Sequence, residues 1–270
     1  MLDLIIRNGK CYIDGELKEV DVAIKDKKIH QIGQISEEAK ETIDASGHTV
    51  LPGCIDTQTH FREPGSTDTE DLHTGSRAAI AGGITSVFEM PNTNPPTSNK
   101  KEFQRKLDLA KNRMYCNYAF YFGATAENAD DLASLKDLEG CCGIKLFAGS
   151  STGNLLVAEE DDIDKVFQNA SKVVAVHSED EAILKVNKKL IKHGDVHTHP
   201  VWRSAECAIS STRRIVRIAE KYNKKAHVLH ITTKEEIDFL SQHKGNITFE
   251  ITPQHLTIYA PDCYDKLGTY

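Results

Sequence analysis

The stretch IDTQTHFREPG, residues 55–65, joins a short strand to a chemically distinctive turn. The strand begins with apolar residues and ends in alternating polar ones, Asp56, Gln58 and His60. A strand that ends in Asp-x-His-x-His is a recurring metal-binding cradle, and here Gln58 takes the place of the first histidine. We therefore expect residues 54–61 to form the first strand of an α/β domain, with a metal site that is altered at one ligand.

After this strand, strand-like apolar runs alternate with amphipathic helical stretches. The further expected strands are ITSVFEMPN (84–92), MYCNYAFYFGA (114–124), CCGIKLFAG (141–149), KVVAVHSED (172–180), KAHVLHITT (225–233) and ITFEITPQH (247–255). Serial strand–helix units predict a parallel sheet, and about seven in one row favour a (β/α)8 barrel over a doubly wound sheet. The expected fold class is α/β, with an incomplete TIM-type barrel at residues 52–270.

The first 51 residues have a different sequence pattern from the rest of the chain. They carry β-branched runs that are separated by turn signals such as Asp14-Gly15. We expect a small β-rich N-terminal domain at residues 1–51.

Polar side chains stand near the carboxyl ends of the expected strands. They are His60, Arg62, Asn92, Lys145, His177 and His230. In a barrel, chemistry gathers at the carboxyl ends of the strands. A lone histidine in such a place is more often structural, but three histidines and a lysine on one rim are the set that a catalytic divalent metal requires.

Lys145 stands inside the apolar run GIKLF, and this position allows two interpretations. A lone lysine of this kind most often extends from the sheet toward water. Next to histidines, burial would instead disfavour the ammonium form. The neutral amine can then capture carbon dioxide as a carbamate, whose two oxygens can bridge two metals.

Other histidines are weaker candidates. DVHTHPVW contains a literal His-x-His at His197 and His199, but it lies between helical stretches and has no strand before it. We interpret it as a surface loop. His255 follows a proline, where it can simply shape a turn.

Composition narrows the function classes. The net charge of −7 over 270 residues argues against nucleic acid or an anionic membrane as the main partner. No window approaches the ~20 apolar residues that a membrane helix needs, and the N-terminus does not read as a signal peptide. Seven scattered cysteines indicate free thiols in a reducing cytoplasm. We expect a cytoplasmic protein with a small-molecule substrate.

Together these residues resemble the class I dihydroorotases, within the amidohydrolase superfamily of cyclic amide hydrolases. The resemblance covers essentially the whole chain. It is carried by LPGCIDTQTHFREPG, AGGITSVFEMPNTNPPT, GIKLFAGSSTG, VVAVHSEDE, AHVLHITT and FEITPQHL. The combination of HFREPG with MPNTNP is its most specific part.

The resemblance implies roles for individual residues. His60 would bind the first zinc ion, Lys145 would be the carboxylated lysine, and His177 and His230 would bind the second ion. Arg62 and Asn92 would hold the substrate carboxylate, and a planar guanidinium does match a carboxylate bidentately.

The implied reaction is the reversible interconversion of dihydroorotate and N-carbamoyl-aspartate in pyrimidine biosynthesis. In the family a metal-bound hydroxide attacks the ring amide carbonyl.

Two features depart from the family pattern. Gln58 offers a neutral amide oxygen, which suits zinc less well than an imidazole, so we expect one or two ions with the first site weakened. The stretch that carries the family's catalytic aspartate on strand eight is absent from these 270 residues, so no general base is assigned. Asp262 and Asp265 lie in the wrong loop to replace it.

Without strand eight, the first and seventh strands would have unpaired edges. We expect either a second copy of the chain or another protein to cover them.

Three hypotheses therefore remain open. The chain is the N-terminal portion of a dihydroorotase-like hydrolase, or a shortened and catalytically inactive relative that serves as a structural partner, or a hydrolase of another cyclic amide. Arg62 counts against the third hypothesis. Gln58 and the missing aspartate favour the second if 270 residues are the whole product.

Overall fold

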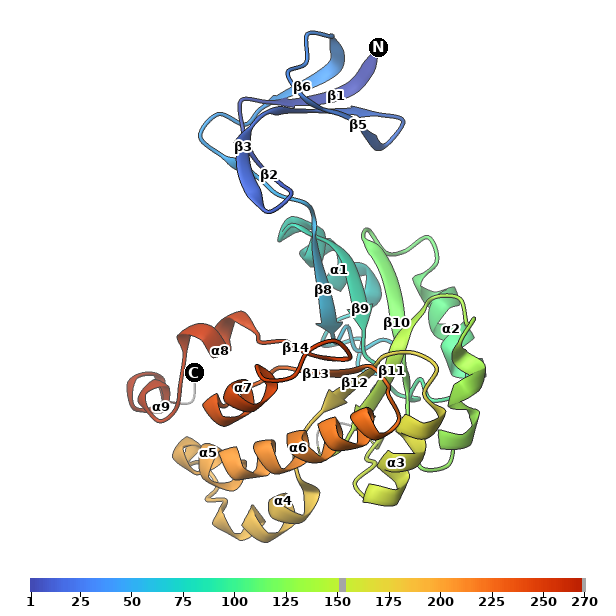
Figure 1. Cartoon of the computed structure of the whole chain (residues 1–270), viewed down its shortest axis with the longest axis vertical. Coiled ribbons are helices and arrows are strands. Elements are labelled where there is room, and N and C mark those ends of the chain that lie inside the picture. Colours follow the sequence, from blue (N-terminus) through green and yellow to red (C-terminus); the bar gives the residue numbers. More distant parts are fainter. Residues whose placement is uncertain (151–153, 269–270) are drawn as a thin grey trace. The chain divides into compact units, whose positions relative to one another are not determined.

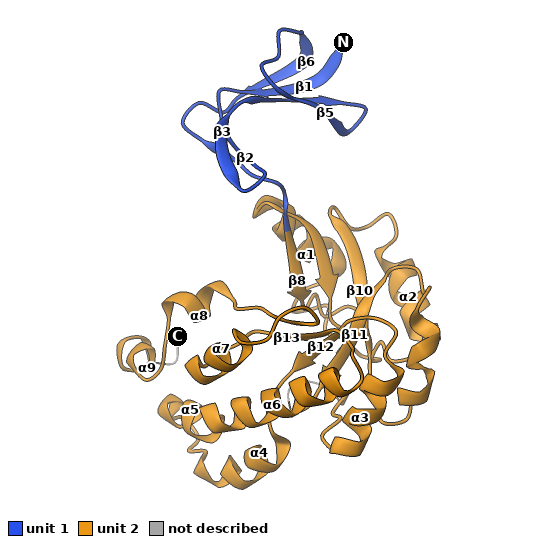
Figure 2. Cartoon of the chain, viewed as in Figure 1, with its two compact units in different colours: residues 1–54 blue, residues 55–270 orange. Residues whose placement is uncertain are grey.

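The computed structural model describes residues 1–150 and 154–268, and the chain divides into two compact units, Met1–Cys54 and Ile55–Tyr270 (Figure 2). The last three residues of the GIKLFAGSSTG motif lie outside the described residues.

Unit 1 is β-rich, which confirms the prediction for the N-terminal segment. Its four-stranded sheet has the order β5-β4-β1-β6, and its three-stranded sheet has the order β3-β2-β7. The strands are β1 (Leu2–Arg7), β2 (Lys10–Ile13), β3 (Glu16–Glu19), β4 (Asp21–Lys25), β5 (Lys28–Gly33), β6 (Ala39–Asp44) and β7 (Thr49–Val50). The β2–β3 hairpin turns at Asp14 and Gly15, whose φ angles are 53° and 87°. Two consecutive positive φ values are typical of the tight turns that favour Asp-Gly.

Unit 2 is built on seven strands in sequential order, β14-β13-β12-β11-β10-β9-β8 (Figure 1). The register is parallel for every pair from β9 to β14. The strands are β8 (Cys54–Thr59), β9 (Ile84–Glu89), β10 (Asn117–Gly123), β11 (Cys141–Phe147), β12 (Val174–His177), β13 (Ala226–Val228) and β14 (Ile247–Phe249). The predicted incomplete barrel of about seven units is confirmed.

Helices alternate with the strands and lie outside the sheet, and the last two follow β14 and have no buried residues (Figure 1). They are α1 (Leu72–Ala81), α2 (Lys100–Ala110), α3 (Glu160–Asn169), α4 (Glu181–Asn187), α5 (His199–Trp202), α6 (Ala205–Lys221), α7 (Lys234–Leu240), α8 (Pro253–Thr257) and α9 (Asp262–Leu267). Short 3₁₀ helices are η1 (Ala129–Leu135), η2 (Lys188–Leu190) and η3 (Val196–Thr198). The largest core cluster lies between these helices and the sheet, with Phe103, Phe120 and Phe167 fully buried. Among the described residues, no helix is both long and apolar enough to cross a lipid bilayer.

The last expected strand is shorter than its sequence suggested. β14 ends at Phe249, and α8 begins with Pro253 in its first turn. Proline suits the first turn of a helix because an N–H at that position would have no acceptor within the helix. Gln254 and His255 are therefore helical rather than part of the strand.

The sheet curls until its two edge strands approach each other. β8 and β14 stand at opposite ends of the strand order, yet Thr57 Oγ1 donates a hydrogen bond of 2.6 Å to Glu250 Oε2. Inside the curl, Met90, Tyr121, Ala175 and Leu229 form a small buried cluster. The curl therefore brings the carboxyl ends of distant strands to one rim.

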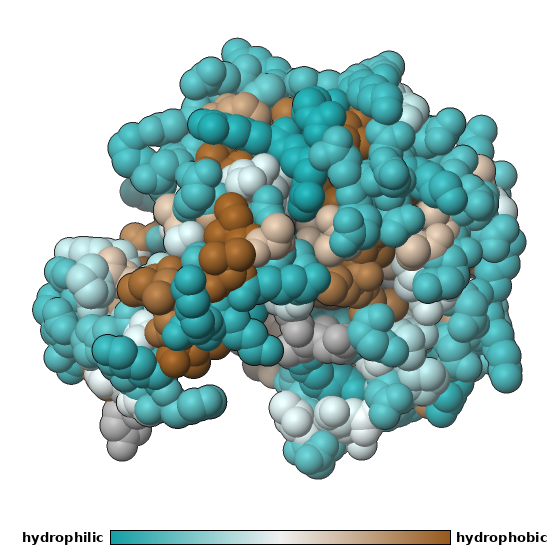
Figure 3. Space-filling model, turned by 90° about the horizontal axis from the view of Figure 1, so that it is seen from below, coloured by the Kyte–Doolittle hydropathy of each residue, from teal (hydrophilic) through white to brown (hydrophobic). Residues whose placement is uncertain are grey.

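Apolar side chains remain exposed at both edges of the sheet. Ile55 on β8 is 59% exposed, and Leu256 and Tyr259 beyond β14 are 68% and 67% exposed. The face seen in Figure 3 has a mainly hydrophilic rim, with apolar residues reaching the surface between hydrophilic ones. These edges are the places where the barrel is open.

A buried ion pair joins the end of β9 to α2. Lys106 lies on the buried stripe of α2 with Phe103 and Ala110, and its ammonium contacts the Glu89 carboxylate. Lys106 Nζ also donates to Met90 O at 2.8 Å, and Glu89 accepts from the Phe61 N–H. Burial raises the pKa of Glu89 to about 7 and lowers that of Lys106, and each partner opposes the shift of the other. The pair ties β8, β9 and α2 together beneath the rim.

We expect Lys106→Met to lower the free energy of unfolding by about 3–5 kcal/mol, because it leaves the Glu89 carboxyl buried without its cation. The double variant Lys106→Met with Glu89→Gln should recover much of this loss, since both charges are gone and the introduced amide oxygen can still accept from the Phe61 N–H. Urea denaturation followed by circular dichroism measures both effects. A double variant less stable than Lys106→Met would contradict the pairing argument.

Candidate active site

His177 and His230 meet at the rim. His177 is the last residue of β12, and His230 follows β13 by two residues. Val176 pairs with Val228 in adjacent parallel strands, so His177 is level with Leu229, and His230 lies one residue further along, past the end of β13. Their ring centroids are 5.0 Å apart, and His177 Nδ1 lies 3.2 Å from His230 Nε2. Two ring nitrogens that face each other in this way can bind one cation between them after a small adjustment.

The other nitrogen of His177 is already occupied. His177 Nε2 donates to Glu179 Oε2 at 2.7 Å, and an ionised carboxylate can only accept. The neutral ring therefore carries its proton on Nε2 and leaves the Nδ1 lone pair facing His230. Burial lowers the pKa of His177, although the hydrogen bond to Glu179 opposes that shift. The neutral imidazole is the form that binds metals.

His230 has an unusual backbone as well as a buried ring. Its φ is 39°, in the left-handed region that costs a non-glycine residue of order 1–3 kcal/mol. Burial, reinforced by the neighbouring His177 and Lys145, lowers the pKa of His230 to about 3. A histidine at a strand end that combines a left-handed backbone with a strongly lowered pKa is typical of a functional site rather than of a packing role.

Lys145 is 1% exposed and lies beside the histidine pair. Its Nζ donates to Leu146 O at 3.3 Å and stands 4.2 Å from the centre of the Phe147 ring, which in turn packs against His177. No carboxylate of the described residues lies within ion-pair distance of this amine. Burial lowers the pKa of Lys145 well below its usual value, with the more distant Glu250 opposing the shift. Burial therefore favours the neutral amine, which is the form that can react with carbon dioxide.

His60 and Asn92 stand together on the β8–β9 side of the rim. The His60 ring hydrogen-bonds the Asn92 side chain, and Asn92 follows β9 by three residues. Burial, then the charges of Arg62 and Lys145, lowers the pKa of His60 to about 4. His60 is therefore neutral and within electrostatic reach of Lys145.

Gln58 presents the clearest sign of a missing partner. Its Oε1 is buried and has no hydrogen-bond partner among residues 1–150 and 154–268. A buried carbonyl oxygen without a partner costs about 1–3 kcal/mol unless something else binds it. Gln58 lies two residues after Asp56 on β8 and two residues before His60, which follows the strand.

The HFREPG turn holds Arg62 in a fixed conformation. Arg62 has φ 60°, a left-handed value for a non-glycine residue. The turn is anchored by Glu63, which accepts from Leu72 N at 3.0 Å and from Arg113 Nη1 at 2.8 Å. A Cβ on Gly65 would lie 2.8 Å from Asn94 Cβ, so only glycine allows this contact between the two motifs. The turn therefore places the half-buried residue Arg62 within electrostatic reach of His60.

The residues brought together fit a divalent metal only if Lys145 takes part. Within the described part of the chain, no three His, Cys, Asp or Glu side chains converge to hold an ion. The His177–His230 pair needs a further donor, and a carbamate on Lys145 would supply anionic oxygens beside it. The unpartnered oxygen of Gln58 offers another. On this donor chemistry the set fits zinc.

Two carboxylates near the rim, Glu179 and Glu250, lie outside the set expected from the sequence. Glu179 orients His177, and its signal was the acidic residue two places after a strand-end histidine. Glu250 accepts from His227 Nε2 at 3.1 Å as well as from Thr57, and its Oε1 is buried with no partner among the described residues. Its signal was an acid directly after an apolar strand.

The histidines set aside lie elsewhere in unit 2. His197 is in η3 and bonds Asp265 Oδ1 at 2.8 Å, while Tyr264 contacts His199 at 3.3 Å. These contacts join α9 to the η3–α5 segment. Neither histidine contacts the His177–His230 pair. Asp265 takes part in the contact between α9 and the η3–α5 segment.

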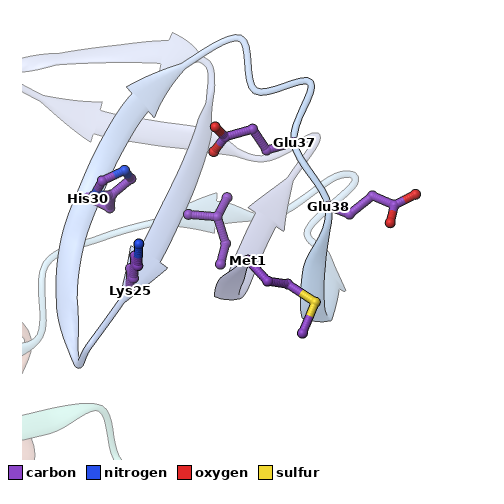
Figure 4. A pocket seen from close by; sticks show the side chains of 6 residues that line it. Met1, Lys25, His30, Glu37 and Glu38 are labelled. Atoms are coloured by element: carbon purple, nitrogen blue, oxygen red, sulfur yellow. The ribbon is translucent and has the colours of Figure 1, made fainter.

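A surface pocket on unit 1 does not provide a second site. It is lined by Met1, Leu2, Lys25, His30, Glu37 and Glu38 (Figure 4). Lys25 and His30 come from adjacent strands β4 and β5, and the two glutamates come from the loop before β6. Open mixed charges of this kind lack the buried donors found at the rim of unit 2.

Comparison with known proteins places the chain among related hydrolases. Residues 49–258 match the sequence model of the amidohydrolase family. A dihydroorotase of Methanosarcina mazei is 32% identical over 285 aligned positions, covering 100% of this chain, and an allantoinase of Escherichia coli is 32% identical over 286, covering 99%. The solved L-hydantoinase of Arthrobacter aurescens aligns over 100% of this chain with a TM-score of 0.91 and 26% identity. This chain spans 62% of the length of each of these three relatives.

We expect zinc titration to reveal one tightly bound ion per chain, because Gln58 replaces an imidazole in the other position. Gln58→His should allow a second ion to bind, or should tighten the binding of the second ion by about 10–100-fold. A change of a metal ligand is expected to have at least this effect. Gln58→Leu, the matched control, should leave the first ion in place. Equilibrium dialysis with metal analysis measures all three proteins. Two tightly bound ions in the unaltered chain would show that Gln58 does not weaken the site.

Proposed function

Because the chain belongs to the amidohydrolase family, we propose that it supplies the metal-binding and carboxylate-binding residues of a cyclic amide hydrolase of the dihydroorotase type. The observation that carries the proposal is the pair His177–His230, with ring nitrogens 3.2 Å apart beside the buried Lys145. In this proposal His177, His230 and carboxylated Lys145 hold zinc, with His60 and Gln58 as a weaker second position.

Zinc in such a site would supply Lewis acidity, which polarises an amide carbonyl and lowers the pKa of water. The residues of this chain perform the remaining tasks of binding and orientation. Glu179 keeps the proton of His177 on Nε2, and Asn92 orients His60. The apolar interior around Met90 and Leu229 excludes bulk water from beneath the rim.

Arg62 supports dihydroorotate as the substrate. No carboxylate of the described residues lies within ion-pair distance of its guanidinium, so its fork is available to an anionic ligand. Dihydroorotate and N-carbamoyl-aspartate carry a carboxylate, whereas a simple hydantoin ring does not. A bidentate guanidinium–carboxylate pair would therefore favour dihydroorotate and N-carbamoyl-aspartate over a simple hydantoin. We place this activity in pyrimidine biosynthesis in the cytoplasm.

Lys145→Met tests the proposed lysine ligand. Met has nearly the same length and is apolar, so the buried site should still pack while the amine is lost. We expect tight zinc binding to disappear, and native mass spectrometry of the unaltered chain in bicarbonate to show one added carbon dioxide that the variant lacks. Unchanged zinc content in Lys145→Met would defeat the carbamate role.

Arg62→Met tests the substrate class. We expect the affinity for dihydroorotate to fall by about 10–100-fold, since a hydrogen-bonded charge contributes roughly 1.5–3 kcal/mol. Hydantoin, which lacks the carboxylate, serves as the matched ligand and should bind both proteins equally. Isothermal titration calorimetry measures the two ligands. Equal loss of both ligands would point to a general defect of the site and against the clamp.

A further inference from the structure

A hydrogen-bond network stands behind His177 on the side away from His230. The Glu179 carboxylate accepts from His177 Nε2 at 2.7 Å and from the Arg203 guanidinium through Nη1. The second terminal nitrogen of Arg203, Nη2, donates to Ser150 O at 3.0 Å. One guanidinium therefore bridges the segment after β11 and the segment after β12.

We propose that Arg203 is a positioning residue that acts on the metal site through Glu179. It fixes the Glu179 carboxylate, and the carboxylate fixes the ring orientation and tautomer of His177, so that Nδ1 faces His230. The proposal rests on the proposed function only in naming zinc as the ion that uses this geometry. The contacts from Arg203 to His177 are independent of it.

Arg203 is itself held in place from several directions. Its guanidinium carbon lies 4.4 Å from the centre of the Trp202 ring, a cation–π distance. Ser150, its carbonyl partner, gives both its N–H and its hydroxyl to Glu181 Oε2, at 2.7 and 2.6 Å. The end of α5, the β11 loop and the start of α4 are thus locked together at this one cation.

Backbone packing also restrains the network. A Cβ on Gly149 would lie 2.6 Å from Glu179 O, so the β11 loop and the Glu179 backbone are already in contact. The backbone at Glu179 is thus held against the β11 loop, and Arg203 restrains its side chain. A lysine could supply the charge but not the two diverging N–H groups that reach Glu179 and Ser150 together.

The experiment compares Arg203→Met with Arg217→Met, a matched control. Arg217 Nη2 pairs with Glu160 at 2.8 Å between α6 and α3, and neither residue contacts the histidine pair. Zinc affinity of the full chain is measured by competition with a chromogenic chelator. We expect Arg203→Met to weaken zinc binding by about 10–100-fold, an effect typical of losing a residue that orients a metal ligand. Arg217→Met should leave zinc binding unchanged. Arg203→Lys should recover part of the affinity.

A second measurement needs no metal. In the metal-free, ¹⁵N-labelled chain, the His177 Nε2–H proton should appear as a slowly exchanging resonance shifted downfield by its carboxylate partner. Assignment comes from its loss in His177→Gln. We expect the proton to exchange faster in Arg203→Met but to remain protected in Arg217→Met, with circular dichroism and the melting temperature alike in both.

The outcomes separate the two proposals. Wild-type zinc affinity together with a protected ring proton in Arg203→Met would overturn the positioning role. If the unaltered chain binds no zinc but its ring proton still depends on Arg203, the positioning role stands and the proposed function fails. Loss of zinc affinity in Arg217→Met as large as in Arg203→Met would also overturn it, because any lost surface ion pair would then have the same effect.

Discussion

The contact between His177 and His230 depends on the parallel register of β12 and β13. This register puts His177 level with Leu229, and His230 follows one residue later, where its left-handed backbone departs from the alternation of the strand. The register is fixed by strands that are almost wholly buried, from Val174 to Val176 and from Ala226 to Val228. The apolar core thus fixes the strand ends from which the two rings project, and the backbone turn at His230 contributes to their contact.

The treatment of charge around the rim separates structural from functional groups. Glu89 has Lys106, and Glu63 has Arg113, so these buried acids are neutralised by cations within the fold. Lys145 has no such partner within ion-pair distance in the described part of the chain. Burial without a partner is costly for a charged amine, which makes a neutral or chemically modified lysine the stable form. The ion pairs hold the rim in place, and Lys145 is left available for chemistry.

The candidate site could be proposed from the sequence because polar residues follow apolar strands. In a parallel sheet all carboxyl ends meet at one rim. The sequence alone therefore suggested that His60, Lys145, His177 and His230 belong to one group. The same reasoning failed for Glu179, Arg203 and Glu250, since their contacts cross between segments with no periodic pattern. Arg203 lies 24 residues from Glu179 in the chain, and nothing in their spacing indicates that they touch.

The sequence by itself determined the order of strands and helices, the fold class and the candidate ligands, because periodicity and strand-end polarity are local properties. It could not decide the tautomer of His177, the lack of a partner for Gln58 Oε1 among the described residues, or the left-handed backbone at Arg62 and His230. Those features arise when distant segments pack together, since a hydrogen bond or a desolvated oxygen exists only once its surroundings are complete. Tertiary structure therefore decided how the residues on the rim are oriented and held, which sequence pattern alone leaves open.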